Sequence, residues 1–219
     1  GARFADRETH AWSGGMSSLF PIFLKLGGRK CLVVGGGPVA EGKLEGLLAS
    51  GANVVVIAPE VTEKIARWSD EQRLVWHARR FEPSDLDGSF LVVVSTGVDA
   101  INESVFREAD ARGILCNSVD EPERCHFYYP AVVRRGPLQI AISTGGLSPS
   151  LASRLRQDLE EQFGPEYRRW VEELGALREK VFARRKDPRR RTRLLERLAS
   201  RRGYERFLRA ERRRSGGSY

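Results

Sequence analysis

One segment, Lys30-Cys-Leu-Val-Val-Gly-Gly-Gly-Pro-Val-Ala-Glu-Gly-Lys43, predicts a short buried strand, a glycine turn and the start of a helix. Its glycines fit the pattern G-x-G-x-x-A, in which the first glycine permits a tight turn and the second lets a pyrophosphate approach the backbone. The free amides and the dipole of the following helix would face that pyrophosphate. We therefore expect a dinucleotide site; the alternative is a glycine-rich turn without a ligand. The predicted cofactor-binding residues of this segment are Gly35, Gly36, Gly37, Pro38, Val39 and Ala40.

Strand-like and helix-like segments alternate after the glycine turn. Continuous apolar runs predict strands at 53–57, 74–78, 90–96 and 113–119, and helices are expected at 38–50, 61–72 and 101–112. Such alternation is typical of a parallel sheet with right-handed crossovers, so the predicted fold class is α/β of the Rossmann type.

Two polar residues lie at strand ends where an open parallel sheet binds its ligand. Thr96 ends the strand at 90–96, and Glu60 follows the strand at 53–57, near the place where an acidic residue binds the ribose hydroxyls of NAD. The alternative for Glu60 is an exposed loop acid. No arginine occurs at this strand end, which disfavours NADP. Glu60 and Thr96 complete the predicted cofactor site.

Three carboxylates, those of Asp99, Asp120 and Glu121, are expected near the same edge. Asp120 ends a core strand and could accept a proton from a substrate that is being oxidised, as a general base does. The alternative is an aspartate that caps the loop. His126 is a candidate substrate ligand, with a hydrogen-bonded structural histidine as the alternative.

The pattern changes after residue 119. Strand-like segments at 127–133 and 138–143 predict a hairpin, and Ser148 is a good N-cap for a helix at 149–163. Further helices are expected at 166–185, 188–200 and 203–213. The predicted organisation is a tail or expression remnant at 1–15, with the natural start at Met16, a nucleotide-binding domain at 16–125, a small α+β segment at 126–163 and an arginine-rich helical domain at 164–219.

The positive charge is concentrated at the end of the chain. Residues 151–219 carry 21 Lys/Arg and 11 Asp/Glu, although the net charge of the whole chain is only +8. This asymmetry indicates an anionic partner, either nucleic acid or an acidic small molecule; the alternative is a solvated helical surface. Nucleic acid is disfavoured, because the helices lack interleaved aromatic residues and a recognition-helix pattern.

Several classes are disfavoured by missing motifs. The glycine turn has no G-K-[ST] ending, which disfavours a P-loop kinase or ATPase, and no H-E-x-x-H or C-x-x-C occurs, so no bound metal is expected. The three cysteines argue against a disulfide framework. No apolar run reaches the roughly 18 residues of a membrane span. We therefore expect a cytoplasmic protein without a membrane partner.

The ordered motifs together resemble the precorrin-2 dehydrogenase / sirohydrochlorin ferrochelatase family, which also forms the amino-terminal part of fused sirohaem synthases. The resemblance covers about residues 18–165. It is carried by Leu19-Phe-Pro-Ile-Phe23, Val34-Gly-Gly-Gly-Pro-Val-Ala-Glu-Gly-Lys43, Asn117-Ser-Val-Asp-Glu-Pro122, Phe127-Tyr-Tyr-Pro-Ala131 and Ala141-Ile-Ser-Thr-Gly-Gly-Leu-Ser-Pro149.

The resemblance implies an NAD-dependent oxidation of precorrin-2 to sirohydrochlorin, and some members also insert Fe²⁺ to make sirohaem. It implies a homodimer, with 126–163 as the dimerisation segment, and it assigns the catalytic acid of the family to Asp120. Thr144 occupies the position of the second serine in the family's S-S-G-G turn, so a regulatory modification of that serine should not be assumed here.

Precorrin-2 carries many carboxylates, so an electropositive wall is a sensible binding surface. The predicted substrate-binding residues are His126, Arg134, Arg135, Thr144, Gly145 and Ser148. Two other interpretations stay open: a bifunctional enzyme that also inserts Fe²⁺, and a nucleotide-sensing module whose basic tail binds nucleic acid.

Overall fold

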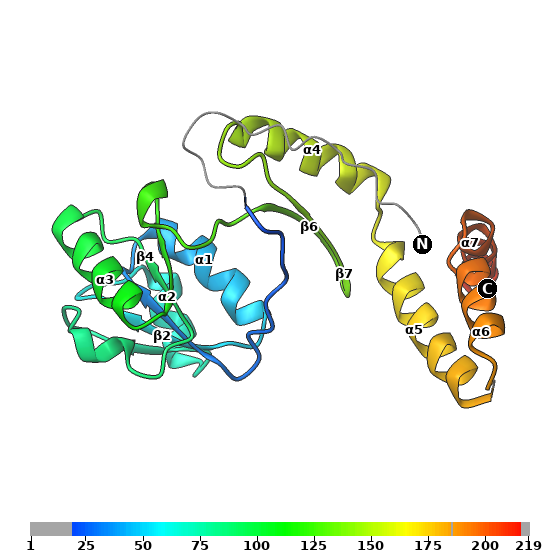
Figure 1. The fold of residues 1–219 in the computed structure, drawn as a ribbon, viewed down its shortest axis with the longest axis horizontal. Helices are drawn as coiled ribbons and strands as arrows, with labels where there is room; N and C mark the ends of the chain where they lie inside the picture. Colours follow the sequence, from blue (N-terminus) through cyan, green and yellow to red (C-terminus); the bar gives the residue numbers. More distant parts are fainter. Residues whose placement is uncertain (1–18, 185, 216–219) are drawn as a thin grey trace, which may run out of the picture. The chain divides into compact units, whose positions relative to one another are not determined.

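The computed structural model describes residues 19–184 and 186–215, which form two compact units (Figure 1). One unit is residues 20–129, and the other contains Leu19 and the described residues from Pro130 onward. The expectations for the tail at 1–15 and for Met16 lie outside the described residues. The predicted domain limits at 125 and 163 stay predictions.

The first unit alternates strands and helices as predicted. Its five strands are all parallel and have the order β3-β2-β1-β4-β5, which confirms the Rossmann-type α/β class. The elements are β1 (Lys30–Val34), α1 (Pro38–Ala49), β2 (Asn53–Ile57), α2 (Glu63–Asp70), β3 (Val75–His77), η1 (Pro83–Leu86), β4 (Leu91–Val94), α3 (Asp99–Ala111), β5 (Leu115–Ser118) and η2 (Pro122–Arg124).

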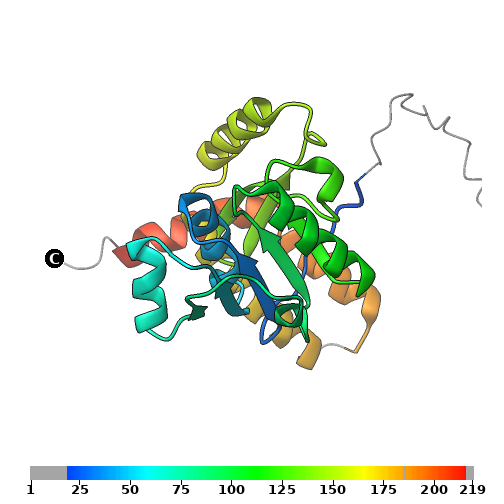
Figure 2. The ribbon, with the colours of Figure 1, turned by 90° about the vertical axis from the view of Figure 1, so that its left-hand side faces the viewer.

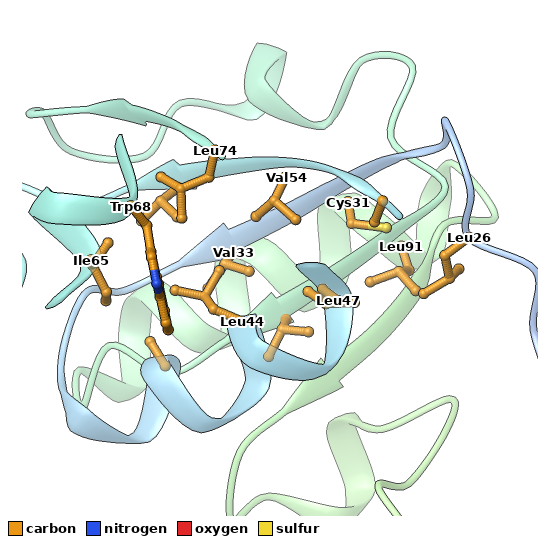
Figure 3. Close-up of a cluster of buried hydrophobic side chains, with 14 of the residues drawn as sticks. Leu26, Cys31, Val33, Leu44, Leu47, Val54, Ile65, Trp68, Leu74 and Leu91 are labelled. Carbon is orange, nitrogen blue, oxygen red and sulfur yellow. The ribbon is translucent and has the colours of Figure 1, made fainter. Parts of the chain in front are cut away.

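The sheet is buried on both faces, which explains why its strands are continuous apolar runs. Val33 belongs to the core on the α1 and α2 side, where Leu44 and Trp68 pack (Figure 3). Its neighbour Leu32 belongs to the core on the opposite side, together with Val105 of α3. Helices α1 and α3 accordingly lie on opposite sides of the sheet (Figures 1 and 2).

The strand order fixes the position of the ligand edge. The connection from β1 leads outward to β2 and β3, whereas the later strands β4 and β5 are added on the other side of β1. The order in which strands are added therefore changes direction between β1 and β4, so the connections from these two neighbouring strands lead to opposite edges of the sheet. Open α/β sheets bind ligands at the carboxyl end of the strands at this point, and the glycine turn follows β1.

The second unit begins with an antiparallel hairpin, as predicted, and continues with helices. Its elements are β6 (Ala131–Arg135), β7 (Leu138–Ile142), α4 (Pro149–Gln162), α5 (Glu166–Arg184), α6 (Pro188–Leu198) and α7 (Arg201–Ser215). An aromatic cluster joins α5 to α7; its rings belong to Phe163, Tyr167, Trp170, Tyr204 and Phe207. No helix in the described part of the chain is long and apolar enough to cross a membrane.

Candidate functional site

Gly35 and Gly36 have no room for a side chain. Gly35 has a φ of +118°, and a Cβ at this position would lie 2.8 Å from the carbonyl carbon of Ser95. A Cβ on Gly36 would collide with the carbonyl oxygen of Glu60, and the amide of Thr62 donates to the Gly36 carbonyl at 2.9 Å. These two glycines therefore let the turn pack against the chain that follows β2 and β4.

Gly37 differs, because a Cβ there would meet no atom within 4 Å. Pro38 occupies the first turn of α1, and Val39 beside it is 52% exposed. The buried hydroxyl of Ser95, which lies against Gly35, has no hydrogen-bond partner among the described residues. An open space at a helix N-terminus and a nearby orphaned hydroxyl fit a diphosphate and its flanking ribose. The residues present therefore fit a bound dinucleotide.

The two other predicted cofactor residues lie at the same edge. The Thr96 hydroxyl donates to the amide oxygen of Asn102 at 2.6 Å and accepts from the backbone N–H of Val98 at 3.1 Å. Glu60 is exposed, and its backbone lies against Gly36. Cofactor binding by Thr96 and Glu60 stays a prediction.

Glu121 connects the end of β5 to helix α3. Its carboxylate accepts hydrogen bonds from the Ser118 hydroxyl at 2.5 Å and from the amide of the buried Asn102 at 3.3 Å. These hydrogen bonds, above all that from Ser118, lower the pKa of Glu121 below its ordinary value. Glu121 is therefore held as a carboxylate by the protein itself.

Arg124 forms ion pairs with Asp99 and Glu121, two of the three predicted carboxylates, and also with Glu103 at 3.7 Å. Its guanidinium lies 2.6 Å from the Asp99 carboxylate and 3.0 Å from that of Glu121. Both acids thus have a cationic partner within the domain, although the Asp99 side chain is still 74% exposed.

Asp120 is in a different situation. Its backbone has a left-handed φ of +65°, which aspartate tolerates better than most residues, and its side chain is exposed. The chain then turns back, so that Cys125 pairs with Asn117, and the N–H of His126 donates to the Cys116 carbonyl at 2.8 Å. Within the described part of the chain Asp120 forms no hydrogen bond or ion pair. Of the three predicted carboxylates, Asp120 is thus the one without a hydrogen-bonding or ionic partner among the described residues, and its role as a base stays a prediction.

The imidazole of His126 is engaged on both sides. Its Nδ1 accepts from the Cys116 backbone N–H at 3.1 Å, and its Nε2 lies 3.2 Å from the Asp110 carboxylate. The ring also packs against Phe106, with centroids 5.3 Å apart. These contacts match the structural alternative; substrate binding by His126 stays a prediction.

Lys43 was not among the predicted site residues, although its ammonium interacts with the charge of Asp120. Its ammonium lies 4.1 Å from the centroid of the Tyr129 ring. Burial lowers the pKa of this ammonium, and the negative charge of Asp120 opposes that shift, so Lys43 and Asp120 interact electrostatically. Lys43 ends the glycine-turn motif in the sequence, but nothing in that local pattern indicates its contact with Tyr129.

The predicted substrate arginines lie in the second unit, on β6. Arg134 is exposed. The guanidinium of Arg135 donates to the carbonyl oxygens of Phe163 at 2.7 Å and Glu160 at 3.1 Å, and so satisfies the C-terminal end of α4.

The predicted turn residues shape the start of α4. The Thr144 hydroxyl accepts from the Ser148 N–H at 3.1 Å, and the Ser148 hydroxyl accepts from the Leu151 N–H at 3.3 Å, as the predicted N-cap should. Gly145 has a φ of +63°, which favours glycine. The structure brings Thr144, Gly145 and Ser148 together in one turn, and their contact with substrate stays a prediction.

Basic side chains also surround a hollow formed by α6 and α7. The hollow is lined by Arg197, Ser200, Arg202, Glu205, Arg206 and Arg209. Within the described residues no three His, Cys, Asp or Glu side chains come together as metal ligands would. That a resident metal is absent stays a prediction.

Comparison with known proteins agrees with this geometry. The family described as "Putative NAD(P)-binding" matches residues 22–131, and the family described as "Sirohaem biosynthesis protein central" matches residues 135–162. The siroheme synthase of Methylobacillus flagellatus is 43% identical over 164 residues, which are 75% of this chain and 35% of that protein. Siroheme synthase 2 of Klebsiella pneumoniae is 45% identical over 140 residues, or 64% of this chain and 31% of that protein.

The chain thus spans about a third of the length of these curated relatives. A solved structure, that of SirC, precorrin-2 dehydrogenase, matches with a TM-score of 0.72 and 30% identity, and covers 84% of this chain and 90% of SirC. The glycine turn, the parallel sheet and the following hairpin and helices are therefore shared features. The chain belongs to the NAD(P)-binding family of sirohaem biosynthesis proteins that contains the precorrin-2 dehydrogenase SirC.

Proposed function

We propose that this chain oxidises precorrin-2 to sirohydrochlorin with NAD⁺, and that Asp120 is the general base. The observation that carries the proposal is the position of Asp120. It follows β5 at the edge where the glycine turn also lies, and its carboxylate has no hydrogen bond or ion pair within the described residues. Membership of the family that contains SirC supports the choice of substrate.

NAD⁺ supplies the hydride acceptor when it is bound at the glycine turn. Gly37 and the N-terminus of α1 would hold its diphosphate, since a Cβ on Gly37 would point into open space. Glu60 would bind the ribose hydroxyls. The fit of these residues supports NAD as the cofactor.

The oxidation removes a hydride and a proton from the substrate, so a proton acceptor is needed. Asp120 would take that proton, either directly or through a water molecule. The hydrogen bonds that Ser118 and Asn102 make to Glu121 hold the turn that carries Asp120. The backbone at Asp120 is thus held at the end of β5 by the bonds of Glu121, and the Asp120 carboxylate itself takes part in none of them.

The basic second unit would bind the carboxylates of this acidic substrate. Arg134, Thr144, Gly145 and Ser148, with Arg135 and His126 as further candidates, are the proposed contacts. The arginine-lined hollow at α6 and α7 supports an anionic partner of this kind. A nucleic acid would be the competing partner, and a gel shift with duplex DNA or RNA at low salt tests it; we expect no shift.

A homodimer is the proposed assembly. Leu147, Leu151 and Leu155 are 67%, 45% and 37% exposed and recur every fourth residue into α4. Such a stripe on a helix is typical of a face that another chain covers. A second copy of this chain would bury it. The reaction is proposed to take place in the cytoplasm.

An anaerobic spectral assay tests the proposed function. Purified protein is given precorrin-2 and NAD⁺, and the spectra of sirohydrochlorin and NADH are expected to appear in equal amounts. Absence of both would refute the dehydrogenase. The siroheme synthases among the relatives favour a second activity, Fe²⁺ insertion, which is measured by adding Fe²⁺ afterwards. Sirohaem formation no faster than the spontaneous rate would remove that second activity.

A further inference from the structure

The ammonium of Lys43 lies in the candidate site but forms no hydrogen bond or ion pair within the described residues. Instead it lies over the Tyr129 ring, 4.1 Å from the centroid. Cation–π contact orients an ammonium without neutralising its charge. A positive charge is therefore fixed in place with its hydrogen-bonding capacity unused.

The surroundings of this charge distinguish it from the other three lysines of the first unit, of which Lys25 is exposed to solvent. Lys64 also lies over an aromatic ring, that of Trp68 at 5.1 Å, but its ammonium forms ion pairs with Glu41 and Glu45. Lys30 donates hydrogen bonds to two backbone carbonyls. Lys43 is half-buried, and partial loss of water leaves a cation in need of an anion.

The Tyr129 ring that holds Lys43 lies two residues after Phe127, whose carbonyl accepts a hydrogen bond at 2.8 Å from the side-chain amide of Asn117, three residues before Asp120. The negative charge of Asp120 accordingly opposes the lowering of the Lys43 pKa by burial, although the two side chains form no ion pair within the described residues. A polycarboxylate substrate that approaches Asp120 is repelled by that carboxylate. A cation beside Asp120 would offset the repulsion and would bind a substrate carboxylate at a fixed distance from the base.

We propose that the Lys43 ammonium binds one carboxylate of the tetrapyrrole substrate, and thereby positions the neighbouring part of the macrocycle at Asp120. This inference rests on the proposed dehydrogenase function. It assigns to Lys43 a role in substrate binding rather than in proton transfer, and Tyr129 is the platform that holds its side chain.

Steady-state kinetics of Lys43→Met test the inference, because methionine keeps most of the apolar stem and removes the charge. We expect the KM for precorrin-2 to rise about tenfold or more, which corresponds to the loss of one charged contact, while the KM for NAD⁺ changes less than about twofold. Lys43→Arg should restore most of the affinity for precorrin-2. Lys64→Met is the matched control, since Lys64 also lies on an aromatic ring, and its kinetics should equal those of the wild type.

Thermal unfolding of each variant shows whether a change in KM comes from weaker substrate binding or from loss of the fold. If Lys43→Met does not fold, Lys43→Gln is measured in its place. An unchanged KM for precorrin-2 in an active, folded variant would overturn the inference alone. A fall in kcat at constant KM would also overturn it, because Lys43 would then act through Asp120. A wild-type protein without activity on precorrin-2 would instead refute the proposed function, and the inference with it.

Discussion

The Ser118 hydroxyl donates a 2.5 Å hydrogen bond to the Glu121 carboxylate and so closes the turn that contains Asp120. The donor is the last residue of β5, and the acceptor follows Asp120 directly. Asn102 and Arg124 bind the same carboxylate from α3 and η2. Glu121, which has several hydrogen-bonding partners, thus lies next to Asp120, which has none among the described residues. We therefore assign a structural role to Glu121 and propose the chemical role for Asp120.

Replacement of Glu121 by Gln should destabilise the protein at neutral pH. Loss of its charge-assisted hydrogen bonds should lower the free energy of unfolding by about 1 kcal/mol, a modest value because the side chain is partly exposed to water. Thermal unfolding at pH 7 measures the effect. Glu123→Gln, which changes an exposed acid of the same loop, should leave the unfolding temperature as it is.

The same variant should change the response to acid. Because the folded protein lowers the pKa of Glu121 below 4.5, its stabilising effect is complete above that pH and is lost as the pH falls through the lowered pKa. Glutamine does not titrate, so the stability gap between wild type and Glu121→Gln should close between about pH 4.5 and more acidic values. A gap of constant size over this range would contradict the assigned hydrogen bonds.

The glycine turn allows a paired test. Gly35→Val should cost about 2 kcal/mol or more of stability, because the φ of +118° and the Ser95 backbone both exclude a side chain. Gly37→Val should fold with near-native stability, since its Cβ meets nothing within 4 Å, but should weaken NAD⁺ binding by about tenfold or more.

Calorimetry of NAD⁺ binding and thermal unfolding distinguish the two variants. If Gly37→Val bound NAD⁺ as well as the wild type, the pyrophosphate would not approach the turn at that residue, and the assigned cofactor site would be wrong.

Features set by residues close together in the sequence could be predicted from it, whereas features set by residues far apart in the sequence could not. The strand at 53–57 and the helix that begins at Pro38 follow from local apolar runs and turn residues, and both were correctly predicted. The partners of His126 could not be predicted in the same way, because its ring meets Asp110 only after the loop turns back along β5.

The surroundings of Lys43 likewise could not be predicted, because they depend on residues far away in the sequence. Its position in α1 is a local property, whereas its contact with the Tyr129 ring depends on the chain's return after β5. The motif containing Asp120 indicates that an acid is present. The pairing of Asp99 and Glu121 with Arg124, which leaves Asp120 available, emerges only when α3 and η2 come together.

The cysteines should differ in reactivity. Burial raises the pKa of Cys31 to about 11 and that of Cys116 to about 12, and both side chains are fully buried. Cys125 is partly exposed, although burial raises its pKa as well. Iodoacetamide at pH 8 should therefore label Cys125 slowly in the native protein, and the other two only after denaturation.

Mass spectrometry of peptides over time measures this order. Labelling of Cys31 or Cys116 as fast as Cys125 in the folded protein would show that the sheet opens far more readily than its packing implies.

The apolar stripe of α4 should control assembly. Leu151→Glu places a charge on a side chain that is 45% exposed, so it should leave the fold intact while preventing association. Light scattering should find a dimer for the wild type and a monomer for the variant. Val75→Glu, which changes a residue of the first unit that is 51% exposed, should remain dimeric. A wild-type monomer would refute the proposed dimer.

The most direct test of the account is the turnover of precorrin-2 by Asp120→Asn. This change removes the proton acceptor but alters no hydrogen bond or ion pair of the described residues. Anaerobic formation of sirohydrochlorin with NAD⁺ should fall by about a hundredfold or more, while NAD⁺ affinity and thermal stability stay at the wild-type values. Asp120→Asn with full activity would contradict the assignment of Asp120 as the base.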